Sequence, residues 1–491
     1  MDSGTKRNLA TYYANFLIVG VTGFIVNPLL LGALGPLLFG VWKSLQRYLD
    51  FATVADGRAS QALKWIVASR TALSTEERQR DIAAAVHVWF RWLPVAFVVA
   101  GAITVGMPLL IDDIPVDLKA MVYSAAAILA LNTILTGLLA IPDSVLMGVN
   151  QGYKSMIVTT AAYILSNATM VLAAISGWPI WTLAAIVLIA AAFNSLFTLA
   201  IARRSITWWG LSKPTTEDIR RVFGYSTWTL GWVAVDKLLL CSELIVISVM
   251  IGAITVTEYA LTTYVMQFVL SIALVTASGF MPLLGSHLGA ADMCAAAERA
   301  RSVRHLVVGV TAVGGGAVLA FNEVFVNWWV GSDQYMGTLM NALLVVLGLQ
   351  FALIRMDGQI LDVTMRIAPK VLIGLASSAG GVLAACCVYA YSGNLPAAMS
   401  ALIMARLISN IAFPVLVARS VPGSALPFLP LFLSVAFLIG SFIVGPRIAT
   451  EALPMRIGLS CAWLAAALAA AWFGLVPRHI VRALLTRSTA S

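Results

Sequence analysis

Long runs of apolar residues recur along the whole chain and restrict its fold more than any other feature. The sequence has 491 residues, of which 60% are hydrophobic and only 11% are charged, whereas soluble domains carry about 25% charged residues. A soluble chain this apolar could not cover its core with polar surface. A bilayer removes that problem, because a helix satisfies its own backbone hydrogen bonds within hydrocarbon. The composition therefore predicts an integral membrane protein of the all-α class.

About 20 apolar residues span the hydrocarbon core of a bilayer. Counting such segments predicts about fourteen transmembrane helices. The second and eighth are the least hydrophobic, so twelve is the alternative count. The predicted spans are Thr11–Leu31, Leu37–Val54, Val88–Ile111, Met121–Ile141, Met156–Ile175, Ile180–Ile201, Tyr225–Ile251, Thr257–Leu284, Leu306–Phe325, Met336–Leu353, Val371–Tyr391, Ala397–Val417, Leu426–Val444 and Met455–Leu475. Two polar stretches, Ser74–Ala85 and Asp292–Val303, are predicted to form short separate helices at the membrane surface.

Lysine and arginine are concentrated in alternate connections between these spans. The connections after even-numbered spans are basic, whereas those after odd-numbered spans carry mainly acidic residues. Because basic loops stay in the cytoplasm, both termini are predicted to be cytoplasmic. The same placement explains the net charge of +9 without a nucleic-acid partner. Basic residues of this group include Lys64, Arg80, Lys154, Arg204, Lys213, Arg221, Arg301, Arg304, Lys370 and Arg419, with Lys6, Arg7, Arg478, Arg482 and Arg487 in the tails.

Three short matches suggest an internal duplication. Gly35–Trp42 aligns with Gly252–Tyr259 at an offset of 217 residues, and Asp143 and Arg204 match Asp357 and Arg419 at similar offsets. We therefore expect two six-helix lobes, 1–207 and 208–421, with two additional helices and a cytoplasmic tail in 422–491. Six is an even number, so the copies share one orientation. Such parallel repeats typically enclose a central cavity, which suits alternating access.

Charged residues at membrane depth are costly and usually face protein or water. In the second span Lys43, Arg47 and Asp50 recur at helical spacing and so share one face. In the seventh span Asp236 and Glu243 lie on one stripe. Together with polar residues at steps of four in the eighth span, these faces predict a hydrated cavity walled by spans one, two, seven and eight.

Further charges stand in other spans or at their ends. Lys237 lies beside the acidic stripe of the seventh span, and Arg355 and Asp357 follow the tenth. Arg406 lies in the middle of the twelfth span. Each of these residues could instead form a structural ion pair or extend to the interface. A guanidinium group stays ionised when buried and matches phosphate geometry, so several cations in one cavity would suit a diphosphate or an acidic glycan.

Short motifs stand at the ends of several spans. They are Leu34-Gly35-Pro36 with Gly40, Trp42 and Leu49-Asp50; Gly252 with Tyr259-Ala260 and Pro282; Pro142 with Leu146-Met147-Gly148, Gln151 and Tyr153; and Trp328-Trp329-Val330-Gly331. These motifs resemble those of the polysaccharide-transporter branch of the multidrug/oligosaccharidyl-lipid/polysaccharide flippase superfamily, the Wzx-type flippases. The resemblance covers about the first 420 residues. Glu258 departs from it, because the family has glycine there, and the family's acidic residue of the seventh span corresponds to either Asp236 or Glu243.

The resemblance implies a flippase of the bacterial cytoplasmic (inner) membrane. Its substrate would be a polyprenyl-diphosphate-linked oligosaccharide, such as a repeat unit of O-antigen, capsule or exopolysaccharide. The spans after the twelfth would help to form a groove for the lipid tail. Further expected partners are membrane lipids and polysaccharide assembly proteins, and we expect a monomer.

The resemblance also suggests roles for the charged residues. The cations Lys43, Arg47, Arg355 and Arg406 would bind the diphosphate or acidic sugars. Asp50, Asp236, Lys237, Glu243 and Asp357 would couple ions or balance charge. No nucleotide-binding motif is present, so we expect no cofactor and an energy source such as an H⁺ or Na⁺ gradient.

Two other transport functions remain open at this stage, and a membrane enzyme is a third rival. A multidrug or toxin exporter of cations is less consistent with several cavity cations and with a first span that lacks an acid. A peptidoglycan-precursor lipid flippase binds a similar anion and is not separated by sequence. A membrane polymerase or ligase needs a large outer loop, but the outer connections here are under about 15 residues, an ordinary length. An enzyme is therefore not expected.

Overall fold

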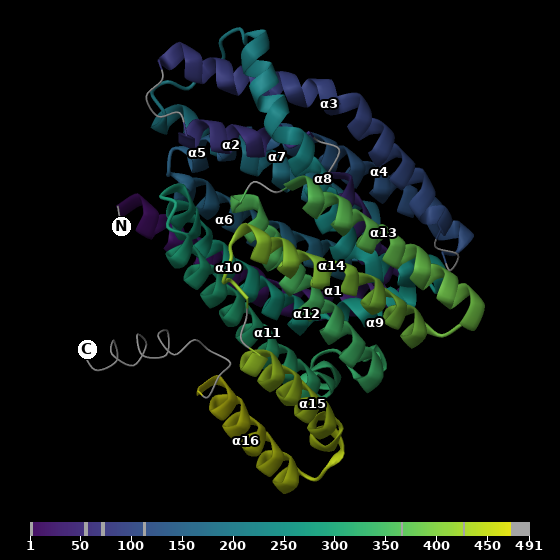
Figure 1. The fold of residues 1–491 in the computed structure, drawn as a ribbon. Coiled ribbons are helices and arrows are strands. Elements are labelled where there is room, and N and C mark those ends of the chain that lie inside the picture. Colours follow the sequence, from purple (N-terminus) through teal and green to yellow (C-terminus); the bar gives the residue numbers. More distant parts are fainter. Residues whose placement is uncertain are drawn as a thin grey trace. The chain divides into compact units, whose positions relative to one another are not determined.

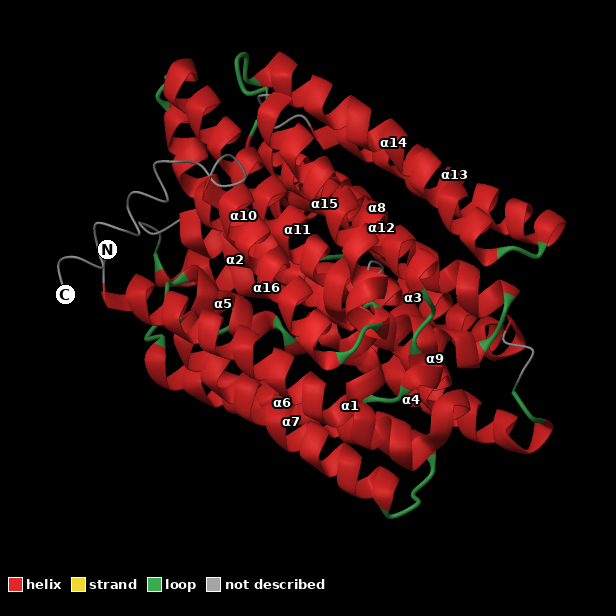
Figure 2. Ribbon diagram, turned by 90° about the horizontal axis from the view of Figure 1, so that it is seen from below, coloured by secondary structure: helices red, strands yellow, loops and turns green. Residues whose placement is uncertain are grey.

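The computed structural model describes residues 3–53, 57–69, 74–110, 114–364, 367–425 and 428–472. The predicted cytoplasmic tail lies outside the described residues. Within them every regular element is helical and none is a strand (Figure 2). In this described part of the chain, twelve helices are long and apolar enough to cross a membrane. The predicted all-α membrane class is confirmed, and the chain is a multi-pass membrane protein.

The helices gather into two compact units, which are described separately. The first comprises residues 1–237 and 251–257, and the second comprises 238–250 and 258–491. The boundary therefore falls within α8 and again within α9. The predicted lobes 1–207 and 208–421 remain a prediction. The elements are α1 Ser3–Ala52, α2 Ala59–Ser69, α3 Thr75–Leu110, α4 Val116–Leu139, α5 Ile141–Gly148, α6 Gly152–Ile175, α7 Ile180–Ser205, α8 Thr216–Met250, α9 Ala253–Thr262, α10 Tyr264–Gly289, α11 Met293–Trp329, η2 Ser332–Gln334, α12 Thr338–Val363, α13 Ile367–Ser392, α14 Leu395–Ser420, α15 Phe428–Thr450 and α16 Leu453–Ala470 (Figure 1).

Two glycines that the sequence alignment equates both interrupt helices. Gly35 divides α1 with a φ of 74° and a ψ of 167°, so the first two predicted spans form one long kinked element. Gly252 separates α8 from α9 with a φ of 136°. Residues with a Cβ rarely adopt positive φ, whereas glycine does so at little cost. Both aligned positions therefore need a positive φ, and both are occupied by glycine.

The segments that follow these glycines cross each other within the first unit, and we call this contact the motif crossing (Pro36 and Gly40 against Ala253 and Thr257). The Thr257 hydroxyl donates to the Pro36 carbonyl at 2.6 Å. A Cβ added to Gly40 would lie 1.8 Å from the Ala253 carbonyl oxygen. The alignment equates Pro36 with Ala253 and Gly40 with Thr257, so the contact is reciprocal, as at a two-fold axis.

The two predicted surface helices are not separate elements, and that prediction was wrong. Ser74–Ala85 and Asp292–Val303 are the starts of α3 and α11, which continue into the apolar spans. Ser74 and Glu77 form a reciprocal capping box, and Asp292 accepts from the Ala295 amide at 3.0 Å. No proline or glycine separates these caps from the apolar residues, so nothing stops the helix.

The eighth predicted span is divided at Thr263, between α9 and α10. The Thr262 carbonyl accepts from the Asn322 amide at 2.8 Å, and the Thr262 hydroxyl accepts from the Met336 backbone at 3.2 Å. These tertiary partners compete with regular helical hydrogen bonding at this point. At this break the Thr263 hydroxyl donates to the Tyr259 carbonyl of α9 and accepts from the Gln267 amide of α10.

In the second unit α11 and α12 form the centre. α11 packs against α10, α12 and α15, and α12 also packs against α10 and α14. The α13–α14 and α15–α16 pairs each lie side by side (Figure 1). On α15 and α16 the apolar side chains of Phe432, Ile439 and Leu464 are exposed. In a membrane protein such surfaces contact lipid.

Candidate functional site

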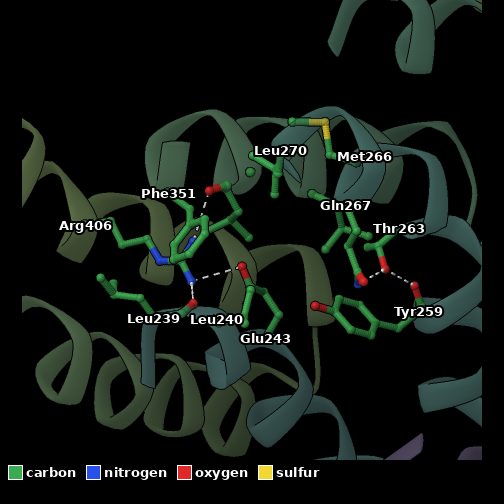
Figure 3. A pocket seen from close by; sticks show the side chains of 13 residues that line it. Leu239, Leu240, Glu243, Tyr259, Thr263, Met266, Gln267, Leu270, Phe351 and Arg406 are labelled. Atoms are coloured by element: carbon green, nitrogen blue, oxygen red, sulfur yellow. Dashed lines mark hydrogen bonds and ion pairs between the residues drawn. The ribbon is translucent and has the colours of Figure 1, made fainter. Parts of the chain in front are cut away.

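A small cavity opens within the second unit between α8, α9, α10, α12 and α14. Its polar wall consists of Glu243, Tyr259, Thr263, Gln267 and Arg406, and leucine, methionine and phenylalanine side chains form most of the remainder (Figure 3). The free volume is about 40 Å³. A water molecule needs roughly 10–15 Å³ by this measure, so the cavity has room for a few water-sized groups.

Arg406 is the one cation on the cavity wall and is only 1% exposed. Its Nη1 donates to the Leu347 carbonyl at 3.0 Å, and Nη2 donates to the Ser242 hydroxyl at 2.5 Å. Nη2 also donates to the Leu239 carbonyl and lies 3.0 Å from Glu243 Oε1. A buried charge needs such partners. The cavity wall thus carries one guanidinium and one carboxylate in direct contact.

The opposite part of the wall is polar but uncharged. Gln267 donates to the Thr263 hydroxyl at 3.2 Å, and that hydroxyl donates to the Tyr259 carbonyl at 2.7 Å (Figure 3). Gln267 and Thr263 are four residues apart, so they stand one above the other on the helix. This arrangement offers amide and hydroxyl groups to a ligand that contacts Arg406 or Glu243.

The cations predicted on the second span lie on α1 in the first unit. Lys43 donates to the Asn27 side chain at 2.9 Å and lies 5.1 Å from the centre of the Phe39 ring. Arg47, one turn further on, is half-buried. No carboxylate is among the contacts given for Lys43. The two cations thus lie one turn apart on the same helix.

Asp50 and Lys237 form an ion pair between α1 and α8 within the first unit. The sequence placed these residues in different spans and grouped both with candidates for charge balance. Asp236, the neighbour of Lys237, is half-buried and does not line the cavity. The structure thus brings Asp50 to Lys237 and Glu243 to Arg406.

Arg355 and Asp357 lie on α12, and neither lines the cavity. Arg355 is half-buried, whereas Asp357 is 2% exposed. Asp357 faces Arg304 of α11, with 2.9 Å between Nε and Oδ1 and 3.1 Å between Nη2 and Oδ2. The Arg304 Nη1 also donates to the Ser424 carbonyl at 3.1 Å. This buried pair joins α11, α12 and the connection after α14.

Sequence reasoning missed two buried cations. Arg304 was assigned to a basic connection because the ninth span was predicted to begin at Leu306, and Lys370 was assigned similarly. Lys370 is fully buried, pairs with Asp362 and donates to the Gly358 carbonyl at 3.2 Å. The available signal was an acidic residue on α12 for each buried cation: Asp357 for Arg304 and Asp362 for Lys370. Among the residues that the structure describes, no group of three or more His, Cys, Asp or Glu is placed to hold a metal ion.

Comparison with known proteins identifies the fold but not a sequence family. No family model matches the chain, and no curated protein sequence matches it. A solved structure described as "Lipid II flippase MurJ, inward closed conformation" is similar over 94% of this chain and 98% of that chain, with a TM-score of 0.68 and 12% identity.

Two further solved structures are also transporters. The Vibrio cholerae MATE transporter VcmN is similar over 85% of this chain and 97% of that chain, with a TM-score of 0.58 and 15% identity. A MOP superfamily transporter from Pyrococcus furiosus is similar over 85% of this chain and 94% of that chain, with a TM-score of 0.50 and 13% identity. The chain therefore has the fold that these membrane transporters share.

Proposed function

We propose that this protein is a flippase that moves a polyprenyl-diphosphate-linked oligosaccharide from the cytoplasmic to the outer leaflet by alternating access. The observation that carries the proposal is the fold shared with a lipid II flippase over 94% of the chain. The resemblance of the span-end motifs to Wzx-type flippases supports an oligosaccharide repeat unit for O-antigen, capsule or exopolysaccharide. A fold alone does not define a substrate. The evidence for the substrate therefore comes from the charged residues.

Cations at membrane depth support an anionic substrate. Lys43 and Arg47 are one helical turn apart on α1, and Arg406 is buried on α14. Maintaining such groups in a membrane is costly unless they have a task or a partner. In the proposed cycle Lys43 and Arg47 attract the diphosphate or acidic sugars, and Arg355 and Arg406 contribute further contacts. Asp50 with Lys237 would balance charge beside the α1 cations.

The two last helices support a lipid-linked cargo. The similarity to the lipid II flippase covers 94% of this chain, against 85% for VcmN and 90% for another MATE structure. The exposed apolar side chains of α15 and α16 suit contact with a polyprenyl tail as well as with bulk lipid. This supports a lipid-linked substrate over a soluble toxin.

The energy source proposed is an H⁺ or Na⁺ gradient. Asp50, Asp236 and Glu243 are the candidate coupling acids. Asp357 is a weaker candidate, because both of its oxygens already face the buried Arg304 guanidinium. Its proposed role is charge balance.

A second candidate function is the translocation of a peptidoglycan precursor. The specific observation in its favour is the substrate named for the similar flippase, lipid II. Both candidates share a polyprenyl diphosphate, so the same cations would serve either. The sugars distinguish them, and an experiment in cells can read the sugars directly.

Deletion of the gene with analysis of lipid-linked glycans tests these alternatives. The proposed function predicts that surface polysaccharide is lost and that its lipid-linked repeat unit accumulates on the cytoplasmic face of the inner membrane. Accumulation of peptidoglycan precursor with cell lysis would support the second candidate. Unchanged surface glycan together with increased sensitivity to cationic dyes would overturn both in favour of a cation exporter.

The α1 cations provide the matching test of the site. Arg47→Ala should abolish complementation of the deletion strain without reducing the amount of protein in the membrane. Arg203→Ala is the matched control, because Arg203 is exposed at the end of α7. Full complementation by Arg47→Ala would contradict the role of this cation in the transport of an anion.

A further inference from the structure

The contact between Arg406 and Glu243 leaves part of the guanidinium without a partner. The five N–H groups of an arginine form a planar fork. In Arg406, Nη1 and Nη2 donate to the acceptors described above, but Nε has no hydrogen-bond partner although it is buried. Other buried Nε atoms in the described residues also make no hydrogen bond, so the position of Arg406 is what distinguishes it. Here the orphan belongs to a side chain that lines an open cavity.

The charges of the cavity wall depend on one carboxylate. Glu243 is 7% exposed and Arg406 is 1% exposed, so both are shielded from water. Of the lining residues contributed by α8, α9, α10, α12 and α14, only Glu243 and Arg406 carry a charge, and Tyr259 is the other titratable group. With Glu243 ionised the wall is neutral. With Glu243 protonated it carries one positive charge, next to the amide and hydroxyl groups of Gln267 and Thr263.

An anion and the Glu243 carboxylate would compete for the same partner. The carboxylate lies 3.0 Å from Arg406 Nη2, which is the geometry that a phosphate oxygen adopts on an arginine. An oxyanion cannot approach the guanidinium closely while a like charge occupies it. Once the carboxylate is neutral, Nη2 keeps its hydrogen bonds to Leu239 and Ser242, and a ligand oxygen can take the position of the carboxylate beside Nη2 and accept from the orphaned Nε.

We infer that the cavity is an oxyanion site closed by its own carboxylate: Glu243 occupies Arg406, and a phosphate-like anion replaces it when Glu243 takes up a proton. The proton comes from solution and is bound by a Glu243 oxygen, and no covalent bond of the anion changes. By reciprocity, anion binding and proton uptake each favour the other. The inference deepens the proposed function and rests on it for its meaning in transport, since the ligand would be one phosphate of the lipid-linked substrate.

Inorganic sulfate is the appropriate probe, because it is tetrahedral like phosphate and keeps its charge from mildly acidic to mildly alkaline pH. Binding is measured by calorimetry on the full chain in lipid nanodiscs, with chloride as the exchanged anion at constant ionic strength. The wild type should bind sulfate more tightly as the pH falls. Glu243→Gln should bind it at least about tenfold more tightly at alkaline pH and should lose most of the pH dependence.

The control is Glu298→Gln, the same substitution at an exposed position of α11, which should keep the wild-type affinity and pH dependence. Arg406→Lys should weaken sulfate binding, because an ammonium lacks the planar fork. If Glu243→Gln does not fold, the pH dependence of sulfate binding by the wild type tests the inference by itself. Sulfate binding that is absent, or equally strong at every pH in the wild type, would overturn the inference.

The outcomes separate this inference from the proposed function. Proton-linked sulfate binding in a protein whose deletion leaves all surface glycans unchanged would retain the site and reject the proposed cargo. Loss of glycan export on deletion, with unaltered sulfate binding in Glu243→Gln, would retain the flippase and reject Glu243 as the competitor.

Discussion

Arg304 and Asp357 show how the protein tolerates charge in its interior. Both side chains are almost fully buried, and two nitrogen–oxygen contacts of 2.9 and 3.1 Å join them. Removing one member of such a pair leaves an uncompensated buried charge, which usually costs about 3–5 kcal/mol. We expect Asp357→Asn to destabilise the protein by about 3 kcal/mol, measured by reversible unfolding of the purified chain.

The double variant Arg304→Met with Asp357→Leu serves as the comparison. It removes both charges, so it should be much closer in stability to the wild type than Asp357→Asn is. Equal stability of Asp357→Asn and the wild type would show that the pair is not the connection between α11 and α12 described above.

Asp218 provides a pH-dependent prediction outside the membrane spans. Partial burial opposes ionisation, but hydrogen bonds from Thr215 and the charges of Arg221 and Arg80 outweigh it and lower the pKa of Asp218. A carboxyl with a depressed pKa in the folded state stabilises the protein above its unfolded pKa of about 3.9. That stability is lost as the pH falls through the lower, folded pKa.

Asp218→Asn should therefore lower the melting temperature near neutral pH and have little effect in strong acid. The Asp218 carboxylate accepts from the Thr215 amide and hydroxyl and so caps the start of α8. The expected cost is about 1 kcal/mol, that of a lost helix cap. Glu217→Gln is the control, since Glu217 is exposed and its ion pair with Arg221 spans 3.7 Å. A similar cost for both variants would mean that net charge, and not the cap, is responsible.

The sequence singled out individual charged residues of the spans, but it did not predict their partners. Arg406 and Glu243 stood out because each lies within an apolar span, and both line the cavity. Their contact joins α8 to α14, which are distant in sequence, so no local pattern reports it. Arg304 was missed for the opposite reason. It lies near the start of an apolar run, where a basic residue is typical of a cytoplasmic connection.

At the scale of helices, the two segments of the motif crossing, which the repeat makes equivalent, pack in direct backbone contact. A methyl group on Gly40 would overlap the Ala253 carbonyl oxygen at 1.8 Å, so the backbones would have to separate. We expect Gly40→Ala to destabilise the protein by about 1–3 kcal/mol, the usual cost of overpacking. The Thr257–Pro36 hydrogen bond would be lengthened as a result.

Gly32→Ala is the matched variant on the same helix, because no heavy atom lies within 4 Å of a Cβ at Gly32. Alanine is favoured over glycine within a helix, so this change should be neutral or stabilising. Thermal unfolding of both variants in the same nanodiscs provides the measurement. If Gly40→Ala matches Gly32→Ala, the crossing does not constrain the two segments.

Hydrophobic length predicted the long helices well and their interruptions poorly. Within the described residues each predicted span is mostly helical, because about 20 apolar residues can satisfy their backbone in no other way within lipid. The kink at Gly35 and the break at Thr263 depend on single backbone angles and on tertiary hydrogen bonds. The short helices α2 and α5 were missed because 11 and 8 residues are too few to give a membrane-length signal.

At the scale of the whole molecule, composition and topology indicate a membrane transporter. The proposal for its substrate comes from the charged residues. The fold is shared with a lipid II flippase and with MATE transporters, so it cannot choose between their substrates. The proposal of an anionic, lipid-linked substrate depends on the α1 cations Lys43 and Arg47, the Arg406–Glu243 cavity and the two last helices.

The most direct measurement is translocation by the purified protein in liposomes. A fluorescent polyprenyl-diphosphate oligosaccharide is placed in both leaflets, and a membrane-impermeant quencher reports how fast it crosses. Flippase activity predicts crossing well above that of empty liposomes, its loss in Arg47→Ala and its retention in Arg203→Ala. Crossing no faster than in empty liposomes, with transport of a cationic dye by the same preparation, would contradict the account.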